Sequence, residues 1–226
     1  MKRGLLMGKF TDKYHLSKSQ SLCLAEKEQS KNIYCGMRME NRAVTLEQTQ
    51  AILNGINVPN VQLDDIQAIL NMRDTWKYLL QTVEEKITFT YWCKLNEYIA
   101  RNEALEWGKL RTGSVGISGT DYIPPIPEKE KVIAELEHIV FDKDMTATEK
   151  ALEIFVWGTR GQYFWDGNKR TSLMLANKIL ISAGAGIMII TDKYMEQFNV
   201  SLLEYYNTGK PSELKKFLYD NAIQGI

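Results

Sequence analysis

Residues 166–170 carry the clearest chemical signal in this sequence. They run Asp-Gly-Asn-Lys-Arg and lie between two segments of helical periodicity, where a loop must deliver the chain to a new helix N-terminus. Gly167 and Asn168 both tolerate turn and left-handed conformations, so the backbone N–H groups that begin the next helix can converge on one ligand. The pattern predicts an anion-binding site at that helix start.

The charged residues of the same segment indicate what the anion could be. Lys169 and Arg170 fall in the first helical turn, where the helix dipole disfavours cations, so a bound anion would compensate them. Asp166 supplies a hard oxygen suited to Mg²⁺, which usually takes one or two carboxylates together with phosphate oxygens and water. We expect a Mg²⁺–nucleotide or another polyphosphate. The alternative is that an Asp-Gly-Asn turn before a helix serves only as a cap.

Helical periodicity dominates the rest of the chain, and the elements that position this loop are helices. A Thr-x-x-Gln capping box at Thr45 opens the first clear one. Helices are predicted over about 46–54, 63–82, 88–102, 128–141, from Thr146 or Thr148 through Trp157, from the motif loop to Gly184 or Gly186, and over 192–206 and 211–222. The fold class is therefore all-α.

One segment, residues 108–128, breaks the helical pattern. It is rich in Gly, Ser and Thr, carries a Ser-Val-Gly-Ile alternation, and ends in Pro124, Pro125 and Pro127, which exclude helix. The alternation predicts one small β-hairpin in this segment.

Composition excludes several classes of protein. The 226 residues hold 28 Lys plus Arg against 28 Asp plus Glu, so no global positive charge favours nucleic acid or an anionic membrane as a partner. The three cysteines are far apart and odd in number, which argues against a disulfide framework and favours the cytoplasm. The short apolar stretch at the start is interrupted from Lys9 onward and does not predict a signal peptide.

The motif and two further segments resemble the Fic/Doc family. Residues 162–171, Gln-Tyr-Phe-Trp-Asp-Gly-Asn-Lys-Arg-Thr, are similar to its signature loop, His-x-Phe-x-Asp/Glu-Gly-Asn-Gly/Lys-Arg. Residues 108–128 are similar to the family's flap hairpin, and residues 34–47 to its N-terminal inhibitory segment. The resemblance implies a Fic-type helical bundle with the flap as its hairpin. It divides the chain into a helical segment over 1–60 with a partial inhibitory motif and a Fic-like domain over 61–226.

The resemblance also assigns roles to individual residues. Gly167, Asn168, Lys169 and Arg170 would hold the phosphates of ATP, and Asp166 would bind Mg²⁺. The flap residues would align a target protein by strand addition; they are Ser114, Val115, Gly116, Ile117 and Ser118. The usual family reaction transfers AMP from ATP to a protein hydroxyl, whereas Doc-type members transfer phosphate. An antitoxin or a homo-oligomer is a further partner that the resemblance leaves open.

Two departures from the family pattern bear on activity. Gln162 stands where the family has its catalytic His, and a carboxamide cannot accept a proton near neutral pH, so transfer should fall by roughly 10²- to 10⁴-fold. Leu173 replaces a second phosphate-binding Arg, with which the family's inhibitory Glu normally pairs, so Glu40 is expected to lack its usual partner. Three interpretations follow: a weakened or redirected protein AMP transferase, a Doc-like protein kinase toxin, or a catalytically degenerate domain that binds nucleotide or a protein partner.

The inhibitory segment is a partial match. Glu40 and Asn41 fit the acidic end of the family's inhibitory motif, but its first position is Gly36. Glu40 could oppose a γ-phosphate by like-charge repulsion, or it could be an ordinary surface or helix-cap carboxylate. At the other end of the chain, Tyr205 and Tyr206 mark either a plain helix end or an approach to the adenine.

Overall fold

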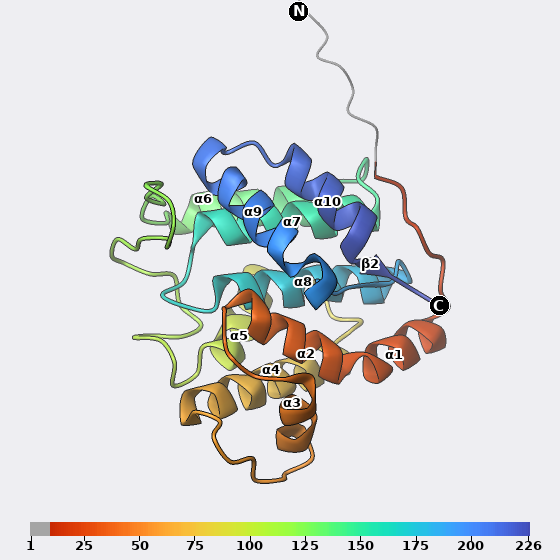
Figure 1. The fold of residues 1–226 in the computed structure, drawn as a ribbon. Helices are drawn as coiled ribbons and strands as arrows, with labels where there is room; N and C mark the ends of the chain where they lie inside the picture. The colour runs from red at the N-terminus through yellow and green to blue at the C-terminus, as the bar shows by residue number, and fades with distance from the viewer. Residues whose placement is uncertain (1–9) are drawn as a thin grey trace, which may run out of the picture.

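The computed structural model describes residues 10–226, and this part of the chain forms ten helices and one very small sheet (Figure 1). The helices are α1 (Lys18–Lys27), α2 (Gln29–Met39), α3 (Leu46–Leu53), α4 (Leu63–Gln81), α5 (Phe89–Ile99), α6 (Lys129–Phe141), α7 (Ala147–Gly161), α8 (Asn168–Ala183), α9 (Asp192–Thr208) and α10 (Ser212–Ala222). The strands are β1 (Ile187–Met188) and β2 (Ile223–Gln224). The predicted all-α bundle is confirmed.

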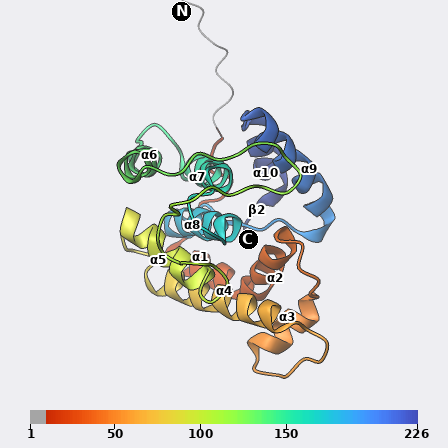
Figure 2. The ribbon, with the colours of Figure 1, turned by 90° about the vertical axis from the view of Figure 1, so that its left-hand side faces the viewer.

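Helix α8 lies at the centre of the bundle. Viewed almost along its axis, it is surrounded by α7, α5, α4, α2 and the C-terminal helices (Figure 2). Its residues are buried on every side rather than along one stripe, which is the pattern of a core helix. Leu173 is 1% exposed within it, so the side chain that replaces the family's second Arg is a core residue.

Helix boundaries follow the capping signals. Capping boxes begin α1 at Ser17, α3 at Thr45 and α7 at Thr146, each with a Gln or Glu at the third helical position that closes the pair of hydrogen bonds. The N-cap of α7 is therefore Thr146 rather than Thr148. Helix α8 ends at Gly184, which adopts the left-handed conformation typical of a C-cap (φ 72°).

The β-hairpin predicted within residues 108–128 is not formed. No paired strand occurs in that segment, which runs as an extended loop from α5 to α6 and crosses the face shown in Figure 2. The small sheet is instead β1 with β2, antiparallel, with Ile187 opposite Gln224 and Met188 opposite Ile223. We call residues 108–128 the flap. The carbonyl groups near its two ends bind an arginine side chain instead of pairing with each other, as described below.

The N-terminal part of the chain packs into the bundle. Helix α2 contacts α4, α8 and α9, and the absence of a side chain at Gly36 makes room for Met72 of α4. Residues 1–9, the first part of the predicted 1–60 segment, lie outside the described residues. The boundary at residue 60 stays a prediction. None of the described helices is long and apolar enough to cross a membrane.

Candidate functional site

The motif loop is held rigidly between α7 and α8. Phe164 is 1% exposed, and its ring centroid lies 4.5 Å from that of Trp92. The Asn168 side chain closes the loop, because its Oδ1 accepts from Phe164 N (3.0 Å) and its Nδ2 donates to Phe164 O (2.9 Å). The predicted turn residues therefore fix the loop from within.

Gly167 begins α8 in the left-handed conformation (φ 73°). A Cβ at this position would lie 2.6 Å from Ile99 Cγ2, so only glycine fits. Because this N-cap residue has no side chain, it cannot cap the N–H groups of the first turn, which helix geometry leaves without intrahelical partners. The backbone arrangement expected for an anion site is present at the start of α8.

Arg170 lies behind this helix start and is 1% exposed. Its Nη1 is 3.0 Å from Glu103 Oε1, its Nε is 3.6 Å from Glu40 Oε1, and its Nη2 is 3.8 Å from Asp166 Oδ1. Burial alone would lower the pKa of this guanidinium, but the charges of Glu40 and Glu103 outweigh burial and raise it. Arg170 is thus a buried cation among carboxylates.

Glu103 is the residue of this site that sequence reasoning missed. Its side chain is 5% exposed, and besides Arg170 it contacts Arg42 Nη2 (2.6 Å) and Asn71 Nδ2 (2.9 Å). Arg42 in turn binds Asp65 Oδ1 (2.9 Å), so the ion-pair network ties the N-terminal segment to α4. Glu103 lies in irregular chain after α5, where no motif or periodicity identifies a buried acid.

Glu40 faces the motif loop. Its carboxylate lies 2.9 Å from Lys169 Nζ, and Lys169 also donates to Met39 O (2.6 Å). Burial would raise the pKa of Glu40, but the charges of Lys169 and Arg170 hold it below its ordinary value. With a side chain only 19% exposed, Glu40 is not an ordinary surface acid, and it pairs with Lys169 and Arg170 where the family's second Arg is missing.

Gln162 also adopts the left-handed conformation (φ 45°). Its carboxamide is engaged at both ends, because Nε2 donates to Thr159 O (2.6 Å) and Oε1 accepts from Asn168 Nδ2 (3.1 Å). Neither histidine of the chain replaces it, since His15 and His138 are exposed and line no pocket described here. The structure offers no imidazole at the position where the family pattern has one.

A pocket of about 360 Å³ joins four segments of the chain. It is lined by Met39, Asn41, Gly116, Ile117, Ser118, Gly119, Gln162, Lys169, Asn199, Leu202, Leu203 and Tyr206. We call it the motif pocket. The inhibitory segment, the flap tip, the motif loop and α9 thus meet as expected, and Tyr206 reaches it while Tyr205 does not. Seven predicted site residues lie outside its lining: Glu40, Ser114, Val115, Asp166, Gly167, Asn168 and Arg170.

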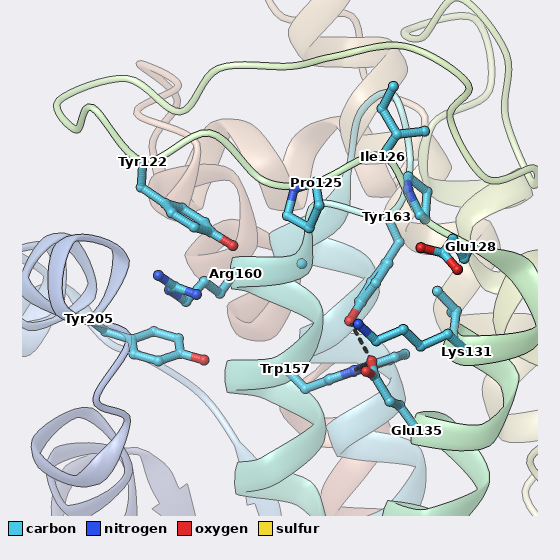
Figure 3. Close-up of a pocket in the computed structure, with 13 residues that line it drawn as sticks. Tyr122, Pro125, Ile126, Glu128, Lys131, Glu135, Trp157, Arg160, Tyr163 and Tyr205 are labelled. Carbon is cyan, nitrogen blue, oxygen red and sulfur yellow. Dashed lines mark hydrogen bonds between the residues drawn. The ribbon is translucent and has the colours of Figure 1, made fainter.

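A second pocket, also about 360 Å³, lies between the flap, α6 and α7 (Figure 3). Gly161 and Tyr163 line it, so residues on either side of Gln162 face a different pocket from Gln162 itself. On one wall the Arg160 guanidinium lies 3.7 Å from the centre of the Tyr122 ring. On the other, Glu135 Oε2 accepts from Tyr163 Oη (3.2 Å). The chain thus borders both pockets at residues 161–163, with Gln162 facing the motif pocket.

Comparisons with known proteins agree with this geometry. The Fic/DOC family model matches residues 86–180. The protein adenylyltransferase Fic of Nematostella vectensis is 26% identical over 200 residues, covering 83% of this chain and 44% of that protein. The protein of the same name from Drosophila melanogaster is 26% identical, covering 84% of this chain and 39% of that protein. The chain therefore spans less than half the length of these curated relatives.

Solved structures share the fold. Fic-1 of C. elegans superimposes with a TM-score of 0.76 at 21% identity, covering 92% of this chain and 64% of that chain. A Fic domain containing signaling protein from Bacteroides thetaiotaomicron gives a TM-score of 0.67 at 18% identity, covering 90% and 84%. The chain thus shares its fold with these Fic proteins, and its residues 86–180, which include the flap and the motif loop, match the Fic/DOC family model.

Proposed function

We propose that this protein transfers AMP from ATP to a hydroxyl group of a protein target, at a rate limited by Gln162. The observation that carries the proposal is the motif pocket, in which Lys169, from the first turn of the glycine-capped helix α8, meets the flap tip. Helix starts of this kind bind phosphate. The relatives named protein adenylyltransferase support the choice of ATP as donor and of a protein as acceptor.

The proposed binding mode uses the residues of the motif loop. The first N–H groups of α8 and the Lys169 ammonium would hold the phosphates. Glu40 lies farther from Arg170 than Glu103 does, so an incoming phosphate could displace it. Arg170 would then add its positive charge to the site. Glu40, beside Lys169, would oppose the γ-phosphate. This is the autoinhibitory role that its position supports.

Asp166 fits the proposed Mg²⁺. Its side chain is 46% exposed, and one carboxylate oxygen accepts from Gly167 N (2.5 Å), which leaves the other free for a cation. The described residues contain no cluster of three His, Cys, Asp or Glu that could hold a metal alone. A single carboxylate still suits Mg²⁺, which takes its remaining ligands from phosphate oxygens and water. When bound, the ion would neutralise phosphate charge.

The proposed reaction needs a proton acceptor that this site lacks. The target oxygen would attack the α-phosphorus, the bond from that phosphorus to the bridging oxygen would break, and pyrophosphate would leave while the hydroxyl proton passes to a base. No carboxylate or imidazole lines the motif pocket among the described residues, and the Gln162 carboxamide cannot accept the proton. Water would have to take it, which explains the slow rate we expect.

Transfer of α-labelled ATP to protein, compared between the native chain and Gln162→His, tests the proposal. We expect Gln162→His to raise the rate by roughly 10²- to 10⁴-fold, the usual contribution of a general base. Label from γ-labelled but not α-labelled ATP would indicate the Doc-like kinase instead. ATP binding without label transfer from either protein would overturn the enzyme and leave a nucleotide-binding domain.

Two expectations complete the proposal. Cys23, Cys35 and Cys93 are all unpaired, which suits a reducing cytoplasm. An antitoxin or a second copy of the chain stays an expectation of the family resemblance.

A further inference from the structure

Arg111 is buried at the base of the flap, with 1% of its surface exposed. Its Nε donates to Gln162 O (2.5 Å) and its Nη1 to Gly113 O (2.5 Å). Its Nη2 donates to Pro125 O (2.6 Å) and to Pro124 O (3.2 Å). One guanidinium therefore binds the outgoing limb of the flap, its returning limb and the backbone of the motif loop.

This contact replaces the strand pairing that the flap lacks. Pro124 and Pro125 have no N–H groups, so the returning limb cannot donate to the outgoing limb at these two positions. Their carbonyl groups need donors, and Arg111 supplies them through a planar fork of five N–H groups. The flap is closed by a side chain at its base.

The environment of Arg111 is unusual for a buried cation. No ion pair to it occurs within residues 10–226, and burial lowers the pKa of its guanidinium. A buried charge bound only to neutral carbonyl dipoles is costly, and an apolar residue could fill the space without that cost. What an apolar residue could not supply is directional bonding to three chain segments at once.

The backbone at the catalytic position depends on this clamp. The Arg111 side chain donates a hydrogen bond to the Gln162 carbonyl, and the Arg111 backbone N donates to Tyr163 O (3.0 Å). These bonds hold the left-handed Gln162 in place from the flap side. The outer part of the flap has separate anchors, Tyr122 against Arg160 (Figure 3) and Thr120 Oγ1 to Asn207 Oδ1 (2.5 Å). Among the hydrogen bonds of residues 10–226, only that of Arg111 joins the flap to residue 162 directly.

We propose that Arg111 is a positioning residue for transfer: it fixes both flap limbs relative to residue 162, so that a target segment docked on the flap presents its hydroxyl at the reacting position. The inference rests on the proposed function. Because Arg111 does not line the motif pocket, its loss should leave ATP binding intact and weaken use of the target.

The test uses Arg111→Lys and Arg111→Met in the Gln162→His protein. Lysine keeps the positive charge but lacks the planar fork of N–H groups. Arg111→Lys therefore still tests the proposal if Arg111→Met does not fold. Lys109→Met is the matched control, because it removes an exposed cation two residues away. Three quantities are measured: ATP affinity by calorimetry, proteinase K cleavage within residues 112–123, and label transfer from α-labelled ATP to a degenerate peptide library with one hydroxyl residue per peptide.

We expect Arg111→Lys to increase flap cleavage about tenfold, since cleavage follows the population of the open form. The KM for the peptide library should rise about tenfold, with ATP affinity within twofold of the parent and Lys109→Met unchanged. A merely structural role would lower ATP affinity and kcat together, and that result, or an unchanged KM, would overturn the positioning role alone. Absence of label transfer from the parent itself would overturn the proposed function, and the positioning role with it.

Discussion

Arg111 and Arg170 contact the two ends of the motif loop, at Gln162 and Asp166, and each is 1% exposed. Arg111 binds only backbone carbonyl groups, and burial lowers the pKa of its guanidinium. Arg170 lies among carboxylates, whose charges raise its pKa despite burial. Two buried cations beside the same loop thus have opposite electrostatic environments: Arg111 faces neutral carbonyl dipoles, and Arg170 faces charged carboxylates.

The difference indicates which of the two can take part in ligand exchange. Carbonyl groups of the flap and loop are part of the backbone and cannot leave without a change of fold. The carboxylate of Glu40 is held by ion pairs to Lys169 and Arg170, and a phosphate can make the same kind of pair. Arg111 therefore holds the backbone of the flap and the motif loop in place, whereas Arg170 and Lys169 can change partners when a nucleotide binds.

Of the substitutions that test the contrast between the two arginines, Glu103→Ala should have the largest effect. It leaves Arg170 and Arg42 without their shortest ion pairs at a site 5% exposed. Removing one partner of a buried pair typically costs about 3–5 kcal/mol, so we expect the free energy of unfolding to fall by that order. Urea denaturation measures it. Glu106→Ala is the control, because Glu106 pairs only with an exposed lysine and should change stability by less than about 0.5 kcal/mol.

An equal, small loss for Glu103→Ala and Glu106→Ala would contradict this prediction. It would show that Arg170 finds water or another carboxylate, and that Glu103 is not the main partner of this buried cation.

Lys178 extends the comparison to a third buried cation. It is 1% exposed, its Nζ donates to Val83 O, and burial lowers its pKa to about 8. An unfolded lysine titrates near 10.4, so between pH 8 and 10 this residue binds more protons in the unfolded chain, and its contribution to stability rises with pH. Relative to Lys178→Met, we expect the native chain to gain roughly 1–2 kcal/mol over this range.

Denaturation curves at pH 8, 9 and 10 check the sign, with Lys143→Met as a control at an exposed position. A difference between the native chain and Lys178→Met that stays flat or falls with pH would be evidence against a depressed pKa in the folded state.

Local signals in the sequence predict the helices well but not the contacts between distant segments. The capping box at Thr45 and the periodicity through α4 predict α3 and α4 within one or two residues of their ends. The Ser-Val-Gly-Ile alternation predicted a hairpin, and that was wrong because Arg111 takes the place of strand pairing. A bond between a side chain and carbonyl groups up to 51 residues away leaves no pattern in local sequence.

The candidate site shows the same division. The resemblance places the motif loop, the flap and the inhibitory segment around one site, and residues of all three segments line the motif pocket, although residues 166–168 do not. Glu103 could not be predicted, because a lone acid after a helix is usually exposed. The family pattern also suggested that Glu40 had lost its partner with Leu173 in place of Arg. Lys169, the neighbour that fills this role, becomes evident only from the contact.

Glu40→Gly tests whether Lys169 and Arg170 exchange Glu40 for a phosphate, because it removes the carboxylate that pairs with both. Without its carboxylate, Lys169 and Arg170 lose a competing anion 2.9 and 3.6 Å away. We expect Mg²⁺–ATP to bind about tenfold more tightly, or about 1.4 kcal/mol. Calorimetry measures it, with the exposed Glu26→Gln as a control for net charge. Equal affinity in the native and Glu40→Gly proteins would place the phosphates away from Lys169.

The smallest effect concerns the titration of Glu40 itself. Its folded pKa is below the ordinary value because Lys169 and Arg170 outweigh burial, so its contribution to stability is present above the unfolded pKa of about 4.3 and is lost as pH falls through the folded value. Between pH 6 and 3 the native chain should lose up to about 1 kcal/mol more than Glu40→Gln. Arg111 has no carboxylate partner, so Arg111→Lys should not alter this acid-dependent difference. If the native chain and Glu40→Gln lose the same stability between pH 6 and 3, the ion pairs of Glu40 contribute nothing to stability. Of the two carboxylates whose charges raise the pKa of Arg170 most, only Glu103 would then distinguish its environment from that of Arg111.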